Sequence, residues 1–314
     1  MTNAVDSLAI GSAIEGRWEV VRSIEAGGMG SLYEVFHRGT AKRAALKLMK
    51  RELVGSLEMR QRFRQETMVT ASIESDYIVG VYDGGTDSQS GLPYLVMELL
   101  RGADLFAELV RLRRLPPRDA LVYLRQTAMG LSKAHAEGVI HRDLKPENLF
   151  LTRREDGSPC IKIVDFGIAK IVAESMSAAE TTRALGTPVY MAPEQVRGDK
   201  TIGIRADLYA LAHVAFTLLT GAAYWSIEQS RLDNVYPLLL AITAGAKEPA
   251  SARALARGVA LPAAFDAWFA KGTALDPAHR FDGALETIDA LAEVFEPDAG
   301  DLPPPTTRGE PVDF

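Results

Sequence analysis

The stretch His141-Arg142-Asp143-Leu144-Lys145-Pro146-Glu147-Asn148 is the most informative part of this sequence. It follows the apolar pair Val139-Ile140, which favours a short strand. A second apolar run, 161–164, also favours a strand and leads directly into Asp165-Phe166-Gly167. The ends of the two predicted strands therefore deliver their polar residues to one place.

Three of these polar side chains are of types that occur in catalytic and metal-binding sites: Asp143, Asn148 and Asp165. A single aspartate in a loop is usually only a turn former. Together, however, the three supply a carboxylate that can accept or orient a hydroxyl proton and oxygen ligands of the kind that Mg²⁺ prefers. The sequence therefore predicts a hydroxyl-activating carboxylate beside a metal site.

The first hundred residues predict a small β-rich lobe with one helix. Strands are favoured at 17–23, 31–36, 43–49, 77–83 and 92–99, and a charged helix at 58–73. The turn Gly27-Gly28-Met29-Gly30 lets the backbone approach phosphates, although glycine-rich hairpin turns are common. Lys47 follows the apolar residues 44–46 in the third strand. It is either an edge charge that reaches solvent or a buried cation that needs an anionic partner such as Glu66.

The character of the chain changes after Gly102, and helices dominate from Ala206 to about Glu296. A long amphipathic helix is predicted over 116–137, with two prolines near its start. The apolar run 208–220 is too short to span a bilayer and predicts a buried core helix. The predicted organisation is a flexible leader over 1–14, a small lobe over 15–98, a large lobe over 99–296 and a disordered tail over 297–314 that holds five prolines.

Composition narrows the functional classes. The 314 residues are 47% hydrophobic and 24% charged, which is enough to bury a sizeable core. A net charge of −6 argues against non-specific nucleic-acid binding. A local arginine cluster is the exception, and we interpret it as a solvated helix end and turn: Arg111, Arg113, Arg114 and Arg118. One cysteine, no signal-peptide order and no membrane span predict a cytoplasmic, reducing compartment.

The ordered set of motifs resembles the bacterial eukaryotic-type (Hanks-type) Ser/Thr protein kinases over roughly residues 15 to 295. The matching motifs are the glycine turn, Lys47, Glu66, 141–148, Asp165-Phe166-Gly167, Gly186-Thr187-Pro188, Ala192-Pro193-Glu194, Asp207 and Arg280. The resemblance implies an α+β, bilobal protein-kinase-like fold, with a small antiparallel β-rich lobe and a larger, mainly helical one. It also implies transfer of the ATP γ-phosphate to Ser or Thr of protein substrates.

The resemblance assigns roles to individual residues. Asp143 orients or deprotonates the substrate hydroxyl, Lys145 neutralises the transferring group, and Lys47 holds the α and β phosphates. Asn148 and Asp165 hold Mg²⁺, with Mn²⁺ as an alternative ion. The implied nucleotide-contacting residues are Ile24, Gly27, Gly28, Gly30, Leu32, Ala45, Lys47, Glu66, Met97, Glu98, Leu100, Asp104 and Phe150. Asp104 has an equally good alternative role as a helix N-cap.

The resemblance implies structural roles for three further residues. Glu194 pairs with Arg280, and Asp207 braces the catalytic loop. Phosphate on Thr181 or Thr182, with Ser175 and Ser177 as further acceptors, is expected to bond Arg142 and order the segment 168–191. The resemblance is compatible with a homodimer through the small lobe, and the sequence does not decide it. The tail, with Thr306 and Thr307, is open as a docking segment, a phosphorylation segment or an inert end.

One departure from the family pattern keeps alternatives open. Glu25 stands where the family has the first glycine of its glycine loop, so a charge lies near the nucleotide roof. A pseudokinase that binds nucleotide without transferring phosphate is therefore a second hypothesis. A small-molecule phosphotransferase is the third, although the segments around Thr187 and Glu194 are typical of a platform for peptide substrates.

Overall fold

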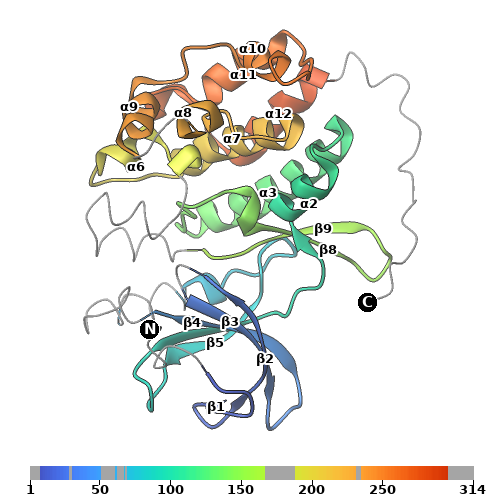
Figure 1. The fold of residues 1–314 in the computed structure, drawn as a ribbon, viewed down its shortest axis with the longest axis vertical. Coiled ribbons are helices and arrows are strands. Elements are labelled where there is room, and N and C mark those ends of the chain that lie inside the picture. The colour runs from blue at the N-terminus through green and yellow to red at the C-terminus, as the bar shows by residue number, and fades with distance from the viewer. Residues whose placement is uncertain are drawn as a thin grey trace.

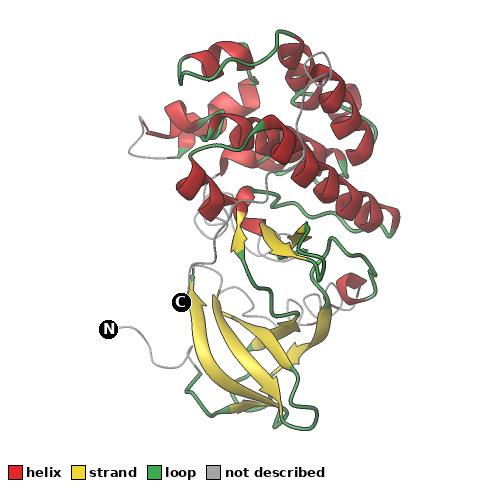
Figure 2. Ribbon diagram, turned by 90° about the vertical axis from the view of Figure 1, so that its right-hand side faces the viewer, coloured by secondary structure: helices red, strands yellow, loops and turns green. Residues whose placement is uncertain are grey.

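The structure is a computed structural model that describes residues 8–27, 30–50, 61, 67, 69–166, 188–230 and 235–295. Helices concentrate in one lobe and strands in the other, with a small sheet where they meet (Figures 1 and 2). The two-lobe division predicted from the sequence therefore appears in the described part of the chain.

The small lobe is built on one antiparallel sheet in the order β1-β2-β3-β4-β6-β5. Its strands are β1 (Ala13–Ile14), β2 (Trp18–Ala26), β3 (Gly30–His37), β4 (Arg43–Met49), β5 (Val81–Thr86) and β6 (Pro93–Met97). Alternate side chains such as Val20, Val35 and Leu46 point to one buried core. The strand predicted over 43–49 is confirmed, because β4 has the same first and last residues.

Residues 8–14 join the small lobe. β1 pairs with β2, Ile14 is buried, and Leu8 packs against the same core while its N–H donates to the Tyr33 hydroxyl at 3.0 Å. The predicted leader thus has its later half tied to the sheet, and residues 1–7 lie outside the described residues.

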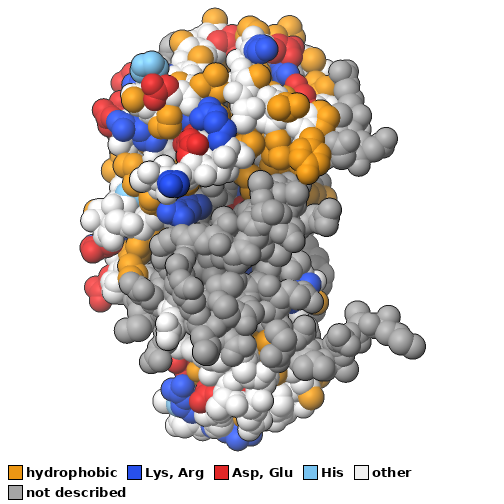
Figure 3. Space-filling view, turned by 90° about the vertical axis from the view of Figure 1, so that its left-hand side faces the viewer, with side chains coloured by type: hydrophobic (Ala, Val, Ile, Leu, Met, Phe, Trp, Pro, Cys, Tyr) orange, Lys and Arg blue, Asp and Glu red, His pale blue; other side chains and the backbone are white. Residues whose placement is uncertain are grey.

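The large lobe contains the helices α2 (Leu105–Leu112), α3 (Pro117–Ala136), α6 (Pro193–Arg197), α7 (Arg205–Thr220), α8 (Ser226–Ser230), α9 (Tyr236–Ala244), α10 (Ala250–Leu255), α11 (Ala264–Gly272) and α12 (Ala284–Phe295). Short 3₁₀ turns lie at η2 (Pro146–Asn148), η3 (Pro188–Tyr190) and η4 (Pro277–His279). Figure 3 faces the side where α6 and α9 lie, and hydrophobic side chains gather there among charged ones. No helix among the described residues is long and apolar enough to cross a membrane.

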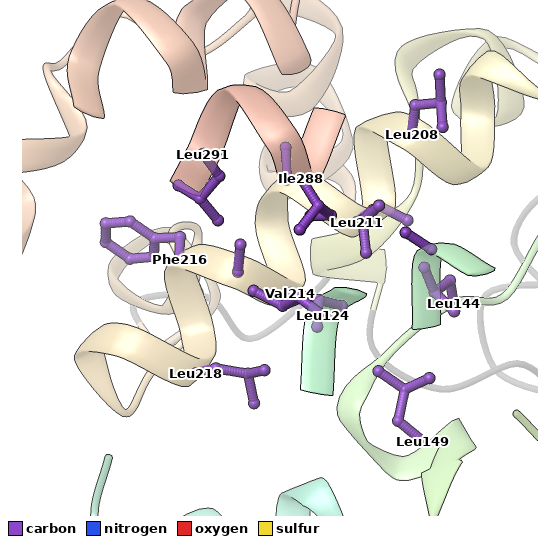
Figure 4. Close-up of a cluster of buried hydrophobic side chains, with 14 of the residues drawn as sticks. Leu124, Leu144, Leu149, Leu208, Leu211, Val214, Phe216, Leu218, Ile288 and Leu291 are labelled. Atoms are coloured by element: carbon purple, nitrogen blue, oxygen red, sulfur yellow. The ribbon is translucent and has the colours of Figure 1, made fainter. Parts of the chain in front are cut away.

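Helix α7 forms the centre of the large lobe. Every residue from 206 to 220 is buried, so the core helix predicted over 208–220 is confirmed. Its side chains meet those of α3 and α12, and Leu144 and Leu149 pack at the edge of the same cluster (Figure 4). The segment 141–148 is therefore anchored to the hydrophobic core by Leu144 within it and by Leu149 directly after it.

A three-stranded sheet in the order β7-β8-β9 lies between the helices and the small lobe. Its strands are β7 (Ala103–Asp104), β8 (Leu149–Arg153) and β9 (Pro159–Ile163). The prediction of a strand at Val139-Ile140 is wrong. Val139 instead donates its N–H back to the Ala134 carbonyl at 2.9 Å and buries its side chain in the core, and no strand among the described residues pairs with it.

Candidate active site

The backbone of the loop 141–148 is held in place by one carboxylate. Asp207, near the start of α7, accepts hydrogen bonds from the backbone N–H groups of His141 and Arg142, each at 2.8 Å. His135 of α3 lies 2.8 Å from the same carboxylate. Arg142 has a φ of +66°, a conformation that costs energy for a side chain other than glycine. The two N–H bonds to Asp207 stabilise this conformation.

Burial alone would raise the pKa of Asp207. The hydrogen bond and charge of His135, with further contributions from His141, outweigh burial and hold this pKa below its usual range. Asp207 therefore stays ionised and remains a strong acceptor for the loop.

His141 joins the loop to the end of β9. Its Nε2 lies 2.9 Å from the Val164 carbonyl, and its Nδ1 accepts the Asp143 N–H at 3.2 Å. Its ring packs edge-on against Phe166, with centroids 4.6 Å apart. Val164 and Phe166 are the two chain neighbours of Asp165. The buried His141 side chain therefore links the segment that carries Asp143 to the segment that carries Asp165.

Asp143 is held by two neighbours from its own loop. Lys145 Nζ donates to Asp143 Oδ2 at 2.8 Å, and Asn148 Nδ2 donates to the same oxygen at 3.1 Å and to the Asp143 carbonyl at 2.7 Å. Val164 N donates to the Asn148 carbonyl at 3.0 Å, so the loop also joins the segment that carries Asp165. The predicted grouping of Asp143, Asn148 and Asp165 is thus present, with Lys145 beside Asp143.

Lys47 reaches across from the small lobe. Its side chain is mostly buried, and its Nζ lies 2.6 Å from Asp165 Oδ2. Burial alone would raise the pKa of Asp165, but the charge of Lys47 and its hydrogen bond hold that pKa below the ordinary value. Of the two alternatives for Lys47, the buried cation with an anionic partner is observed. Its other predicted partner, Glu66, lies outside the described residues.

Backbone packing makes glycine necessary at one position of the glycine turn. A Cβ added at Gly30 would lie 2.0 Å from the Leu48 carbonyl oxygen, so only glycine fits there. Gly27 N donates to the Gly30 carbonyl at 2.8 Å and closes the turn, while Gly28 lies outside the described residues. Glu25 is exposed on β2 and pairs with Leu32 across the sheet.

Ile24, the other roof residue predicted to contact nucleotide, lies at an irregularity of β2 and is partly exposed.

The predicted adenine site contains the link between the lobes. Met97 is buried and pairs with Ala45 across β4 and β6. Glu98 N donates to the Gly80 carbonyl at 2.8 Å. Among the described residues, the Glu98 carbonyl and the Leu100 N–H have no partner, so both remain free for a ligand edge. Phe150 lies half-buried on β8, where it pairs with Asp104.

Asp104 is the N-cap of α2. Its Oδ1 accepts the Ala107 N–H at 2.8 Å, which satisfies one of the free donors at the start of a helix. This observation supports the capping alternative. Asp104 Oδ2 has no partner among the described residues, so a role toward a ligand is compatible with the cap.

Three contacts around the site were missed by sequence reasoning. His135 supports Asp207, Gln195 Nε2 donates to the Arg142 carbonyl at 2.8 Å, and Lys162 lies 3.0 Å from Glu98. Gln195 and Lys162 belong to ordinary-looking polar stretches and carry no signal in one sequence. His135 stands on the otherwise apolar face of α3, and a polar residue on a buried helix face is a signal that could have found it.

The comparisons with known proteins agree with this geometry. A family model described as "Protein kinase domain" matches residues 18–253. The chain belongs to the protein kinase domain family. The resemblance and the bilobal fold class predicted from the sequence are therefore confirmed.

Bacterial protein kinases are among the similar proteins. Serine/threonine-protein kinase Pkn1 of Myxococcus xanthus is 41% identical over 206 residues, which cover 66% of this chain and 29% of Pkn1. Serine/threonine-protein kinase PknH of Mycobacterium bovis is 34% identical over 307 residues, which cover 96% of this chain and 48% of PknH. This chain thus spans less than half the length of these two relatives.

A solved protein kinase domain has the same fold. The crystal structure of the Mycobacterium tuberculosis PknI kinase domain matches with a TM-score of 0.72 and 29% identity, covering 92% of this chain and 100% of that one.

Proposed function

We propose that this chain transfers the γ-phosphate of ATP to serine or threonine hydroxyls of proteins. The observation that carries the proposal is the polar cluster at the lobe boundary. There Lys47 of the small-lobe sheet bonds Asp165, and Asp143 is bonded by Lys145 and Asn148. The names of Pkn1 and PknH support the same activity and the same acceptor residues.

Asp143 has the geometry that a hydroxyl acceptor needs. Its Oδ2 receives Lys145 and Asn148, while its Oδ1 has no partner among the described residues. In the proposed mechanism, Oδ1 accepts a hydrogen bond from the substrate hydroxyl and orients its oxygen toward the γ-phosphorus. Lys145, already beside that carboxylate, lies where it can offset charge on the transferring group.

Two oxygens fit a divalent cation. Asn148 uses its Nδ2 toward Asp143, which leaves its Oδ1 without a partner among the described residues, and Asp165 likewise keeps Oδ1 free while Oδ2 bonds Lys47. Hard oxygen donors of this kind suit Mg²⁺ or Mn²⁺, which complete their shells with phosphate oxygens and water. When bound, the cation neutralises phosphate charge. Lys47 is the proposed contact to the α and β phosphates.

The decisive experiment is a radiolabel transfer assay with Mg²⁺, ATP and a generic protein substrate, run beside Asp143→Asn. We expect transfer to Ser or Thr, identified by phosphoamino-acid analysis, and a loss of roughly 10²-fold or more in Asp143→Asn, because the amide cannot accept the proton. EDTA should abolish transfer, and added Mg²⁺ or Mn²⁺ should restore it. Activity that survives Asp143→Asn would overturn the assignment of Asp143.

The same assay separates the remaining hypotheses. Nucleotide binding with no transfer by the wild type would indicate the pseudokinase, and transfer only to a small molecule would indicate the third hypothesis. Glu25 is the one residue that favours the pseudokinase. Its exposed position on β2 supports an active enzyme, because Glu25 leaves the cluster around Asp143 intact.

Autophosphorylation is part of the proposal. The expected acceptors Thr181, Thr182, Ser175 and Ser177 lie outside the described residues. Arg142 Nε is buried and has no partner among the described residues, which supports a role for this guanidinium as a receiver of phosphate. Mapping of phosphosites after incubation with Mg-ATP tests this step, and no phosphate between Ser175 and Thr182 would refute it. We also propose a cytoplasmic signalling role with protein substrates and leave the homodimer as a hypothesis.

A further inference from the structure

Helix α2 has one apolar face that nothing in the described part of the chain covers. Leu105 and Leu109 are buried in the large-lobe core. Phe106 and Val110, one turn apart on another face, are 51% and 71% exposed. Large apolar side chains gathered at one place on a surface mark an interaction site more often than single ones do.

Two arginines adjoin this face. Arg113 and Arg114 follow α2 directly, are exposed, and have no hydrogen-bond or ion-pair partner in the described part of the chain. Arg111, by contrast, already pairs with Glu108 at 2.6 Å. The arginine cluster that the sequence suggested was merely solvated therefore contributes two free cations beside an uncovered apolar stripe.

The loop that carries these arginines is rigidly attached. Arg113 N donates to the Leu109 carbonyl at 2.7 Å, and Leu115 N donates to the Leu218 carbonyl of α7 at 2.8 Å. The Arg113 carbonyl oxygen would lie 2.0 Å from a Cβ at Gly221, so α7 approaches the loop as closely as a glycine allows. A preorganised surface of this kind loses little entropy when it binds.

We propose that this surface, the α2 face formed by Phe106, Val110, Arg113 and Arg114, binds the segment 298–305 of the same chain. That segment reads Asp298-Ala299-Gly300-Asp301-Leu302-Pro303-Pro304-Pro305. Its two carboxylates complement the two free guanidinium groups. Its leucine and three prolines complement the apolar side chains, because proline-rich segments are preordered and dock on aromatic surfaces at low entropic cost.

Charge and reach both favour this occupant. Residues 296–314 carry the acidic residues Glu296, Asp298, Asp301, Glu310 and Asp313 against the single basic residue Arg308. The described chain ends at Phe295 of α12, which packs against the same core as Leu105 and Leu109. Figure 1 shows that end of α12 (red) and α2 (green) on the same side of the large lobe.

Pro305 lies ten residues beyond Phe295. At about 3.1 Å per residue these span roughly 30 Å, about the width of a small domain. Because the segment is tethered, its effective concentration at α2 is in the millimolar range, so a weak contact suffices.

Disulfide trapping in the full chain tests the proposal. The double variant Val110→Cys with Leu302→Cys should form an intramolecular disulfide under mild oxidation. The control pairs Leu302→Cys with Val122→Cys, which is 41% exposed on the neighbouring helix α3. The native Cys160 is buried and remains in both. We expect the first pair to close at least roughly tenfold faster, because docking raises the local concentration above that of a free tether.

A charge swap provides the second arm. Arg113→Glu with Arg114→Glu should reduce the crosslinking rate of the first pair to that of the control, and adding Asp298→Arg with Asp301→Arg should restore it. Equal rates for the two cysteine pairs, or no effect of charge reversal, would overturn the proposal. So would disulfides that form only between two chains. None of these readouts depends on phosphoryl transfer.

Discussion

Arg280 and Glu194 form an ion pair that is almost wholly removed from solvent. The two guanidinium nitrogens lie 2.6 and 2.7 Å from the two carboxylate oxygens, and the side chains are 0% and 6% exposed. Arg280 also donates to the carbonyls of Ala274 and Arg205. With these donors satisfied, the pair tolerates burial, but either partner left alone would be a buried, uncompensated charge.

We therefore expect Glu194→Gln to lower the free energy of unfolding by about 3–5 kcal/mol, measured by urea denaturation at pH 7. The matched control is Lys133→Gln, which breaks the exposed Lys133–Glu137 pair at 3.8 Å and should change stability by less than about 1 kcal/mol. Similar small effects of both substitutions would show that the buried pair does not stabilise the lobe.

At the scale of elements, α7 and α3 together shape the loop 141–148. Asp207 holds two successive N–H groups of the loop and is itself held by His135, so the loop follows two helices that the hydrophobic core fixes. The positive φ of Arg142 depends on this brace. The position of Asp143, one residue further on, therefore depends on a carboxylate that does not touch the substrate.

Asp207→Asn should accordingly reduce kcat by roughly tenfold to a hundredfold with little change in the KM for ATP, because it replaces one acceptor oxygen by a donor and misplaces the loop. Steady-state transfer kinetics at saturating substrate measure this split. Glu137→Gln, a change at the exposed end of α3, serves as the control and should leave kcat within about twofold. A rise in KM alone would contradict the positioning role.

The elements show what one sequence could and could not predict. The helix around 116–137 was predictable because its apolar residues repeat with helical spacing, and the helix 208–220 and the strand 43–49 were predictable because each is a mostly apolar run. The supposed strand at Val139-Ile140 was not, since a short apolar pair looks the same whether it joins a ladder or enters a core. Lys47 had two open alternatives in the sequence, and only the fold, which brings Asp165 to it, decides between them.

For the whole molecule, several polar contacts join the two lobes. Lys47 bonds Asp165, Lys162 bonds Glu98, and the backbone of Val79 donates to the Ile163 carbonyl at 3.0 Å. One hydrophobic core lies within the small-lobe sheet, whereas the core of the large lobe also takes in Ile73 and Ile78 from the small lobe. The polar contacts at the lobe boundary therefore lie beside an apolar contact between the lobes.

Within the large lobe, His213 links global stability to pH. Its ring is enclosed by Tyr209, Tyr224, Trp225 and Phe269, and neither ring nitrogen has a partner among the described residues. Burial, with smaller effects from Arg280 and Arg253, lowers the pKa of His213 from 6.5 to about 3. The unfolded chain therefore binds a proton below pH 6.5 that the folded chain excludes, and stability falls as the pH falls from 6.5 toward 3.

The pKa values of Asp165 and Asp207 are also lowered from 3.8, but those carboxylates lose their contribution only below about pH 4. Between pH 7 and pH 5, His213 alone should therefore cost the wild type about 2 kcal/mol of unfolding free energy. In urea denaturation at pH 7, 6 and 5, His213→Leu should lose less stability than the wild type by about that amount, while the exposed control His279→Gln should follow the wild type. Parallel pH profiles for His213→Leu and the wild type would mean that His213 is hydrated or paired in the folded protein.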